Sequence, residues 1–375
     1  MLYELHNWEG GPSFVRVFQY VTMRTIGGAA TAFTLSMILG PSMIRWLTRL
    51  KVGQTVRDDE VLAMQRSKAG TPTMGGLLII VTVVISSFLW AKPGNVFVLL
   101  TMATMVWMGA IGFIDDYLKV RHKTSKGLAG RWKLILQATW VMIAFGFILN
   151  HPDLKLEIGK LMLPFLKDPV IQDMGLPFTF VFMLLVMVGA TNAVNLTDGL
   201  DGLAIGCSNS VAVAYLVMAY AAGHRVFAEY LQVPYIADAG EIAVFFGCLL
   251  GAGLGFLWFN CHPARVFMGD TGSLALGGAI AMGAILIKQE LVLIFVGGVF
   301  VMEALSVVLQ VASFKITGKR IFRCSPIHHH FEMKAREDAE REGRDVEVVE
   351  TMVTIRFWIL SIIFAIVGIA TLKLR

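Results

Sequence analysis

The chain has 375 residues, of which 56% are hydrophobic and only 16% are charged. The apolar residues come in blocks of about 20, long enough to cross a hydrocarbon core of ~30 Å, which excludes an ordinary soluble protein. The formal net charge of +5 arises from basic residues in short loops between these blocks, so it does not indicate nucleic acid as a partner. The four cysteines form no CxxC pair, which argues against a disulfide framework or a structural zinc site.

The hydropathy pattern predicts an all-α polytopic membrane protein, with residues 1–375 forming a single integral membrane domain. An even number of crossings, ten, is expected, so both termini should lie on the same side of the membrane. The expected membrane-spanning helices lie at roughly 22–44, 72–91, 95–114, 132–149, 176–194, 202–222, 241–259, 272–288, 291–313 and 352–372.

The loops between these helices divide into two sets that differ in charge. Most of the chain's 32 lysines and arginines fall in one set, at about 45–71, 115–133, 195–201, 260–270 and 315–351. By the positive-inside rule this set is cytoplasmic, and both termini then face the outer, periplasmic side. Every strong polar cluster lies in the same set, so we expect the functional site on the cytoplasmic face.

The first cluster is Asp115-Asp116, where a long apolar run ends in two adjacent carboxylates. Acidic groups at the end of a membrane helix cost desolvation energy unless water, a cation or a metal meets them. With Lys119 and Lys123 close behind, the pair suits Mg²⁺ carrying a phosphorylated ligand. The alternative is that the aspartates only end the helix and pair with the lysines.

The second cluster repeats a polar side chain every three residues, at Asn192, Asn195, Asp198 and Asp201. On a helix this spacing gives a polar stripe along one side. Amides and carboxylates together suit the base and ribose of a nucleotide, and Gly199, beside Leu200, allows a close approach of the backbone. A polar helix end with capping residues is the alternative.

The third cluster runs from Asn260 to Ser273 and opens the eighth predicted span. Its Asp270 could supply another oxygen to a metal, and Phe267 could stack on a base. The new helix would begin here, with Thr271 or Ser273 as a cap. An ordinary capped turn is the alternative.

The fourth cluster is the tandem His328, His329 and His330, three of the chain's eight histidines. Their side chains suit phosphate binding, acid–base chemistry or metal binding, although a zinc site lacks partners at ligand spacing. In an extended segment His329 would point away from the other two. A purely structural cluster is the alternative.

Three further segments stand out. Lys68, in a Gly-rich turn before the second span, could hold a phosphate or could be a simple membrane-edge lysine. Glu303, within the ninth span, should face the interior of the bundle. Residues 332–346 have the pattern of a solvated helix, because their Glu and Arg residues recur at i,i+4 spacing.

Taken together, four motifs resemble the polyprenyl-phosphate N-acetylhexosamine-1-phosphate transferases, and within them the phospho-N-acetylmuramoyl-pentapeptide transferase family. The motifs are Asp115-Asp116-Tyr117, Asn195–Gly202, Phe267–Ser273 and Pro326–Glu332. The resemblance implies a Mg²⁺-dependent enzyme of the bacterial cytoplasmic (inner) membrane, with its active site facing the cytoplasm. Such enzymes move phospho-N-acetylmuramoyl-pentapeptide from UDP to undecaprenyl phosphate, giving UMP and lipid I for peptidoglycan synthesis. It also implies a homodimer embedded in membrane lipid.

The resemblance further implies roles for individual residues. Asp115, Asp116 and Asp270 would form the acidic centre, with Asp270 as the main Mg²⁺ ligand and Asp115 or Asp116 activating the lipid phosphate. The segment His328–His330 would help to position phosphate or substrate. The residues implied to bind the substrate are Lys68, Lys119, Lys123, Asn192, Asn195, Asp198, Gly199, Leu200, Asp201, Asn260 and Phe267.

Two other functions remain open at this point. A sister transferase would load N-acetylglucosamine phosphate from its UDP carrier on the same lipid, and the triple histidine favours the muramoyl enzyme over it. A transporter would place polar groups along a pathway at the middle of the membrane, whereas these acids gather at one face.

Overall fold

The computed structural model describes residues 1–8, 12–50, 70–122 and 127–374, and these form helices joined by loops. Nine of the described helices are long and apolar enough to cross a membrane. They are α1 (Val21–Arg49), α4 (Val96–His122), α5 (Gly130–Asn150), α7 (Gly175–Thr197), α8 (Leu203–Ala222), α10 (Glu241–Asn260), α11 (Gly269–Leu286), α13 (Gly298–Thr317) and α15 (Val348–Ala370). The shorter elements are η1 (Leu2–Asn7), η2 (Ser13–Gln19), α3 (Gly76–Trp90), α6 (Pro152–Ile158), α9 (Arg225–Leu231), α12 (Leu293–Val296) and α14 (Ile327–Arg341).

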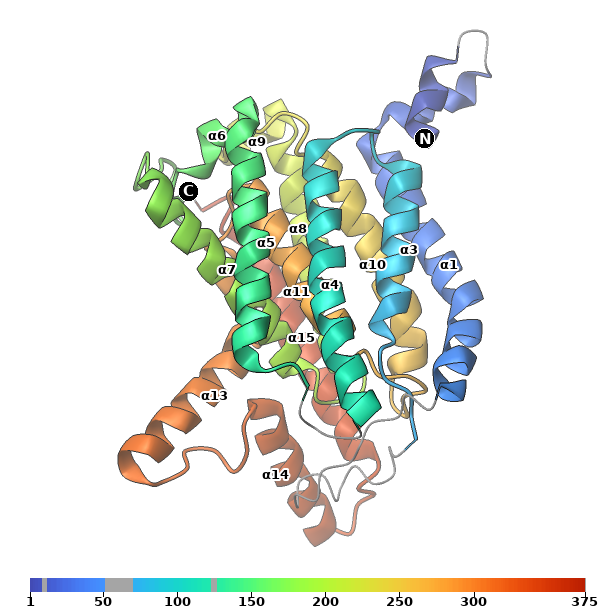
Figure 1. Cartoon of the computed structure of the whole chain (residues 1–375), viewed down its shortest axis with the longest axis vertical. Coiled ribbons are helices and arrows are strands. Elements are labelled where there is room, and N and C mark those ends of the chain that lie inside the picture. Colours follow the sequence, from blue (N-terminus) through green and yellow to red (C-terminus); the bar gives the residue numbers. More distant parts are fainter. Residues whose placement is uncertain (9–11, 51–69, 123–126, 375) are drawn as a thin grey trace.

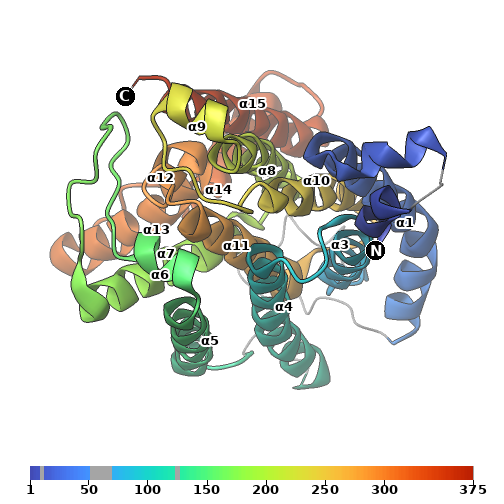
Figure 2. The same cartoon turned by 90° about the horizontal axis from the view of Figure 1, so that it is seen from above.

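The bundle is arranged around α11, which packs against α3, α4, α7 and α8 (Figures 1 and 2). In α11, 89% of the residues are buried, against 22% of the most apolar window of the peripheral α1. Glycine and alanine make up much of α11, and small residues let helix backbones approach closely. At the start of the helix, a Cβ on Gly76 would lie only 2.2 Å from the Cα of Gly272. This packing fixes the end of α11 that carries Asp270.

The predicted all-α polytopic architecture is confirmed, with one short crossing. Helix α3 has only 15 residues, so it is about 22 Å long and falls short of the nine longer helices. The second span was expected from residue 72, but the segment before Gly76 runs along residues 267–268 instead. There the backbone N–H groups of Gly75 and Gly76 donate to the carbonyls of Phe267 and Met268, at 2.8 and 3.0 Å.

Two predicted helix boundaries were wrong in ways that affect the site. Helix α4 does not end before Asp115 but continues to His122, so the aspartate pair lies within the helix. The ninth predicted span, 291–313, is broken at Gly297 into α12 and α13. In Figure 1 α13 leans away from the other helices toward α14.

The solvated helix expected at 332–346 is present but shifted toward the N-terminus, as α14. It therefore includes the three histidines, which were considered as an extended segment. Among the Glu and Arg residues with i,i+4 spacing, Glu332 and Arg336 form an ion pair, at 2.9 Å. Glu337 instead pairs with Arg323, at 2.6 Å.

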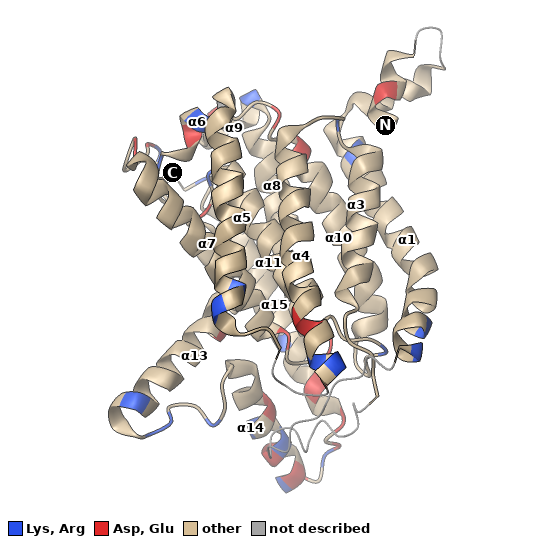
Figure 3. Ribbon diagram, in the orientation of Figure 1, with Lys and Arg blue, Asp and Glu red and all other residues tan. Residues whose placement is uncertain are grey.

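Both termini lie toward the end of the bundle opposite α14, as an even number of crossings requires (Figure 1). Basic residues cluster where α1, α4 and α5 reach the α14 end (Figure 3). The loops that carry the sequence motifs therefore lie at one end of the molecule. We call this the motif end.

Candidate active site

Three carboxylates meet at the motif end of the bundle. Asp115 and Asp116 come from the last turns of α4, and Asp270 comes from the first turn of α11. One oxygen from each lies within 4.8 Å of the others. These aspartates are distant in the sequence, so the convergence expected from the motifs is present.

Two lysines lie between the carboxylates. The Nζ of Lys133, from the first turn of α5, is 2.6 Å from Asp270 and 3.0 Å from Asp115. The Nζ of Lys119, one turn after Asp115 in α4, is 3.3 Å from Asp270 and also contacts Asp115. Closely spaced like charges repel in a partly dehydrated site, and the two ammonium groups offset this repulsion.

Asp116 caps the N-terminus of α11. Its carboxylate accepts hydrogen bonds from the backbone N–H groups of Asp270 and Thr271, at 3.2 and 2.9 Å, and from the Thr271 hydroxyl at 2.7 Å. The helix cap was expected from Thr271 or Ser273, but it comes from a neighbouring helix. Gly269 makes this approach possible, since its φ is +71° and a Cβ there would lie 2.5 Å from Asp116 Oδ2.

The triad satisfies the chemistry of a hard divalent cation. All of its possible donor atoms are carboxylate oxygens, which Mg²⁺ prefers over nitrogen or sulfur. The Asp270 side chain is 14% exposed, against 1% for Asp115 and 4% for Asp116. Asp270 is therefore the carboxylate of the three that is most accessible to a ligand from outside.

The second cluster forms a turn beside the triad. Helix α7 ends at Thr197 and α8 begins at Leu203, so Asp198 and Asp201 lie in the turn rather than on one helical stripe. Burial, together with the negative charges of Asp270, Asp116 and Asp201, raises the pKa of Asp198 to about 8. This effect of Asp270 and Asp116 links the turn electrically to the triad.

The amides and the second aspartate of this region already have partners within the protein. Asn195 Oδ1 accepts from the Ser273 hydroxyl at 2.7 Å, and Asn192 donates to the Val188 carbonyl of its own helix at 2.8 Å. Asp201 and Asn260 are each 4% exposed and hold neighbouring backbone groups. Leu200 is also buried, whereas Gly199 is half-buried.

The histidine segment lies against the same turn. His328 is fully buried, and its ring is so close to Gly199 that a Cβ there would lie 2.2 Å from Nε2. Its Nδ1 is 3.1 Å from the Glu303 carboxylate, which confirms that Glu303 faces the interior of the bundle. His329 contacts Glu332 at 3.1 Å, and His330 accepts from the backbone N–H of Arg323 at 3.2 Å.

Phe267 is among the described residues, whereas two lysines that were expected to bind substrate are not. Phe267 is half-buried, and its backbone N–H donates to the carbonyl of Pro72 at 2.8 Å. Lys68 and Lys123, both expected to bind substrate, lie outside the described residues. Their predicted roles stay predictions.

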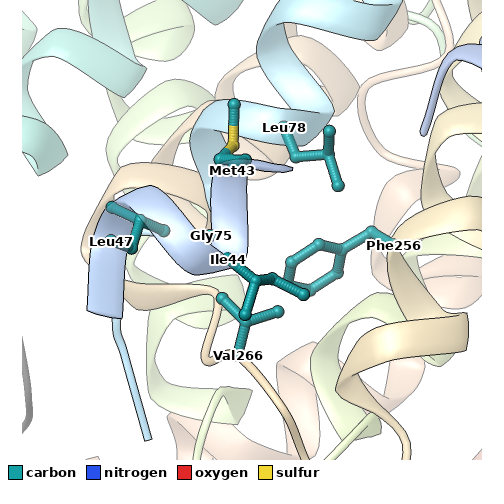
Figure 4. Close-up of a pocket in the computed structure, with 7 residues that line it drawn as sticks. All are labelled: Met43, Ile44, Leu47, Gly75, Leu78, Phe256 and Val266. Atoms are coloured by element: carbon teal, nitrogen blue, oxygen red, sulfur yellow. The ribbon is translucent and has the colours of Figure 1, made fainter. Parts of the chain in front are cut away.

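A small pocket lies on the outer flank of the segment that leads into α3. It is lined by Met43, Ile44, Leu47, Gly75, Leu78, Phe256 and Val266 (Figure 4). The side chains of this lining are apolar, and the space between them is too narrow to hold a water molecule, whereas small-molecule sites are typically about 300–1,000 Å³. The candidate site is therefore the polar cluster around the triad.

The sequence analysis did not single out three residues that the structure places in this region. Lys133 contacts two members of the triad, and His262 and Glu350 both contact Asp201. Lys133 is the last of a series of basic residues that reaches the start of the predicted span 132–149, which was a usable signal. No pattern in the sequence pairs Glu350 with Asp201, because they are far apart in the chain.

Comparison with known proteins matches both the whole chain and its motifs. The glycosyl transferase family 4 model matches residues 96–288, just over half of the chain, which include all three aspartates. A signature of phospho-N-acetylmuramoyl-pentapeptide-transferase matches residues 68–80, a range in which Gly75 and Gly76 hydrogen-bond to residues 267–268.

Relatives with the same name are similar over nearly their whole length. The phospho-N-acetylmuramoyl-pentapeptide-transferase of Methylacidiphilum infernorum is 47% identical over 379 residues, covering 100% of both chains. Those of Desulfotalea psychrophila and Maridesulfovibrio salexigens are 50% and 48% identical; the alignments cover 100% and 96% of this chain and 99% and 96% of theirs. The chain belongs to glycosyl transferase family 4 and, within it, to the phospho-N-acetylmuramoyl-pentapeptide-transferase family.

Proposed function

We propose that this protein transfers phospho-N-acetylmuramoyl-pentapeptide from its UDP carrier to undecaprenyl phosphate, giving lipid I and UMP in peptidoglycan synthesis. The observation that carries this proposal is identity of 47–50% to relatives of that name over essentially the full chain. The meeting of Asp115, Asp116 and Asp270 at one end of a membrane bundle supports it independently.

Mg²⁺ fits the donor set of the triad, and Asp270, Asp115 and Asp116 would hold it. When bound, it would neutralise the diphosphate and the developing charge on the UMP leaving group. The residues of the chain supply the remaining interactions. Lys119 and Lys133 would turn from the carboxylates to the oxygens of the bound phosphates, since an ammonium group binds either anion.

In the transfer, an oxygen of the lipid phosphate forms a bond to the sugar-bearing phosphorus, and the bond from that phosphorus to UMP breaks. Asp115 is the better candidate for orienting and activating the lipid phosphate. Asp116 is committed to three hydrogen bonds at the start of α11, whereas Asp115 accepts one from the Leu128 backbone and otherwise contacts the lysines.

The uridine side of the substrate would bind at the turn beside the triad, near Asp198 and Phe267. Other members of this proposed pocket are Lys68, Lys123, Asn192, Asn195, Gly199, Leu200, Asp201 and Asn260. The segment His328–His330 would hold phosphate or substrate from the opposite side of the turn, because His328 lies against Gly199. Asp201 and Asn260 already accept hydrogen bonds from backbone N–H groups of the protein, so they would shape the pocket.

The protein would lie in the bacterial inner membrane with the motif end in the cytoplasm and would form homodimers. One substrate is a water-soluble nucleotide, and the other is a phosphate on a long lipid tail. The reaction therefore needs a site at the membrane surface, where the motif end would lie. The concentration of basic loops there supports the cytoplasmic orientation.

The test is an assay of the purified protein with undecaprenyl phosphate and either UDP-N-acetylmuramoyl-pentapeptide or UDP-N-acetylglucosamine, with the lipid product identified by mass spectrometry. We expect lipid I and UMP from the muramoyl substrate only. Product from UDP-N-acetylglucosamine alone would favour the sister transferase, and release of UDP in place of UMP would contradict both.

A further inference from the structure

The peptide groups of Asp201 and Gly202, in the turn between α7 and α8, are held by side chains from two other elements. Glu350 of α15 accepts from the Asp201 N–H at 2.9 Å, and Thr354 donates to the Asp201 carbonyl at 3.4 Å. Trp358 donates from Nε1 to the Gly202 carbonyl at 3.1 Å. Asn260, at the end of α10, accepts from the Gly202 N–H at 3.1 Å. All four backbone polar groups of the two residues therefore have side-chain partners.

Three of these partners form a stripe on α15. Glu350, Thr354 and Trp358 are each four residues apart, so they lie on the same face of the helix, one turn above another. Glu350 and Thr354 are 2% and 4% exposed. The Trp358 indole is seated on the first turn of α8, because a Cβ on Gly206 would lie 2.0 Å from its Nε1. We call these three residues the α15 stripe.

The Asp201 side chain is tied to the same place. Its Oδ2 accepts from the Ala264 backbone N–H at 3.1 Å and lies 3.0 Å from Nδ1 of His262. The same Nδ1 is 3.5 Å from Glu350. Burying a carboxylate is costly unless it gains hydrogen bonds, and Glu350 gains its bond from the turn. The burial of Glu350 is thus coupled to the position of Asp201.

We propose that the α15 stripe consists of positioning residues that hold the 198–202 turn in the arrangement that binds the nucleotide. This inference rests on the proposed function, in which the turn forms the uridine side of the site. The stripe acts through the turn, since Glu350, Thr354 and Trp358 hydrogen-bond to backbone groups of Asp201 and Gly202. Two residues of the turn lie in the site itself, because Asp198 is beside the triad and Gly199 is beside His328.

This arrangement separates the effects on the two substrates. Loss of a stripe contact lets the turn move, while Lys119, Lys133 and the triad keep their own contacts. The KM for the UDP substrate should therefore rise by about tenfold or more, as expected when a hydrogen bond to a charged group is lost. The KM for undecaprenyl phosphate should stay within about twofold, and kcat should fall less than the KM of the UDP substrate rises.

The test compares Glu350→Ala with Glu350→Gln and Trp358→Phe. The Gln side chain keeps an oxygen that can accept from the Asp201 N–H, so Glu350→Gln should recover most of the loss. Trp358→Phe removes the donor to Gly202 but keeps an aromatic ring over Gly206. Glu347→Ala and Trp258→Phe are matched controls, because both side chains are exposed, one on the residue that precedes α15 and one on α10, and neither should change the kinetics.

A second readout does not depend on activity. Hydrogen–deuterium exchange of the peptide that covers 198–203 should be faster in Glu350→Ala than in the wild type, and near the wild-type rate in Glu350→Gln. Unchanged exchange in Glu350→Ala, or equal changes in the KM values for both substrates, would overturn the positioning role. If the wild type itself makes no lipid I, the proposed function fails, and the exchange measurement still decides whether the stripe holds the turn.

Discussion

At the scale of single residues, the site is defined by an imbalance of charge. Three carboxylates and two ammonium groups lie within contact distance, which leaves one negative charge in excess when all five are ionised. Such a cluster favours a cation, and the lysines provide that charge from within the chain. The same lysines can later meet phosphate, so the balance suits a site that binds both a metal and a polyanion.

Lys133 therefore has two separable effects. Lys133→Met should lower the thermal midpoint of the purified protein in detergent without added metal, because Lys119 alone then offsets the repulsion between Asp115 and Asp270. Adding Mg²⁺ should restore most of that loss, whereas transferase turnover should stay at least about tenfold below wild type. Lys167→Met, at an exposed lysine, is the control. A midpoint insensitive to Mg²⁺ in the variant would argue against a metal at the triad.

His328 gives the site a dependence of stability on pH. Burial lowers the pKa of His328 below its usual value, and the nearby Glu303 carboxylate opposes this only in part. The unfolded chain then binds a proton more readily than the folded one as the pH falls through about 6.5, so stability decreases below that pH. The fall in thermal midpoint between pH 7.5 and 5.5 should be smaller in His328→Gln than in the wild type. An equal fall in both would mean that other groups cause it.

The acidic residues of the site were predictable because acids are scarce in this chain. A carboxylate at the end of a membrane helix costs desolvation energy, so its presence there indicates a function. Lys133 was harder to find, since basic residues occur at many helix ends for reasons of topology. The pairing of His262 and Glu350 with Asp201 was out of reach, because it depends on how α10 and α15 pack on α8. Helical periodicity within α15 carries no information about its partner.

At the scale of elements, α11 depends on a cap that comes from another helix. Its first turn has Asp116 of α4 as acceptor, whereas the expected caps, Thr271 and Ser273, donate their hydroxyls elsewhere. Sequence patterns detect local caps but not one supplied across the bundle. Sequence patterns also predicted that α4 would end before Asp115. Its last turns are polar in sequence, yet burial against α11 keeps them helical.

This cap predicts a difference between two substitutions. Asp116→Ala should destabilise the protein by about 1–2 kcal/mol, since it leaves the first N–H groups of α11 without an acceptor. Asp116→Asn keeps an acceptor oxygen and should cost less than half as much. Both should lose activity. Equal unfolding midpoints in detergent for the two variants would show that Asp116 does not cap the helix.

Sequence patterns also failed to predict the break between α12 and α13 and the helical conformation of the histidine segment. Residues 291–313 are predominantly apolar, so hydropathy alone predicted one span and could not locate the bend at Gly297. The histidine segment was considered only for the case in which it is extended, and the helix was expected from residue 332. In the structure α14 begins at Ile327, and this start places His328 against Glu303 of α13.

At the scale of the whole molecule, hydropathy and loop charge predicted the architecture well. The described helices, the common end of the motif loops and the common end of the termini all agree with the expected topology (Figures 1 and 3). Periodicity and charge are properties of each segment, so they can be read without knowing its neighbours. The order of packing around α11 and the contacts inside the site depend on pairs of segments and needed the structure.

The proposed orientation can be checked with a cysteine of the chain itself. Cys261 is exposed at the motif end, whereas Cys207 and Cys248 are buried. A membrane-impermeant maleimide should label Cys261 in inverted inner-membrane vesicles but not in intact spheroplasts. A Cys324→Ser background removes the half-buried cysteine at the same end, and Cys261→Ser in that background should abolish the signal. Labelling from the outer side would reverse the proposed topology.

The central claim is that Asp115, Asp116 and Asp270 act as one divalent-metal centre for transfer of the phospho-sugar. The most direct measurement is UMP release from UDP-N-acetylmuramoyl-pentapeptide and undecaprenyl phosphate, with Mg²⁺ or with EDTA. It compares the wild type with Asp115→Asn, Asp116→Asn, Asp270→Asn and, as a control, the exposed Asp168→Asn. We expect UMP only with Mg²⁺, from the wild type and the control, and a rate at least about a hundredfold lower from each triad variant while it remains folded. UMP release at the wild-type rate from Asp270→Asn, or undiminished release in EDTA, would contradict the account.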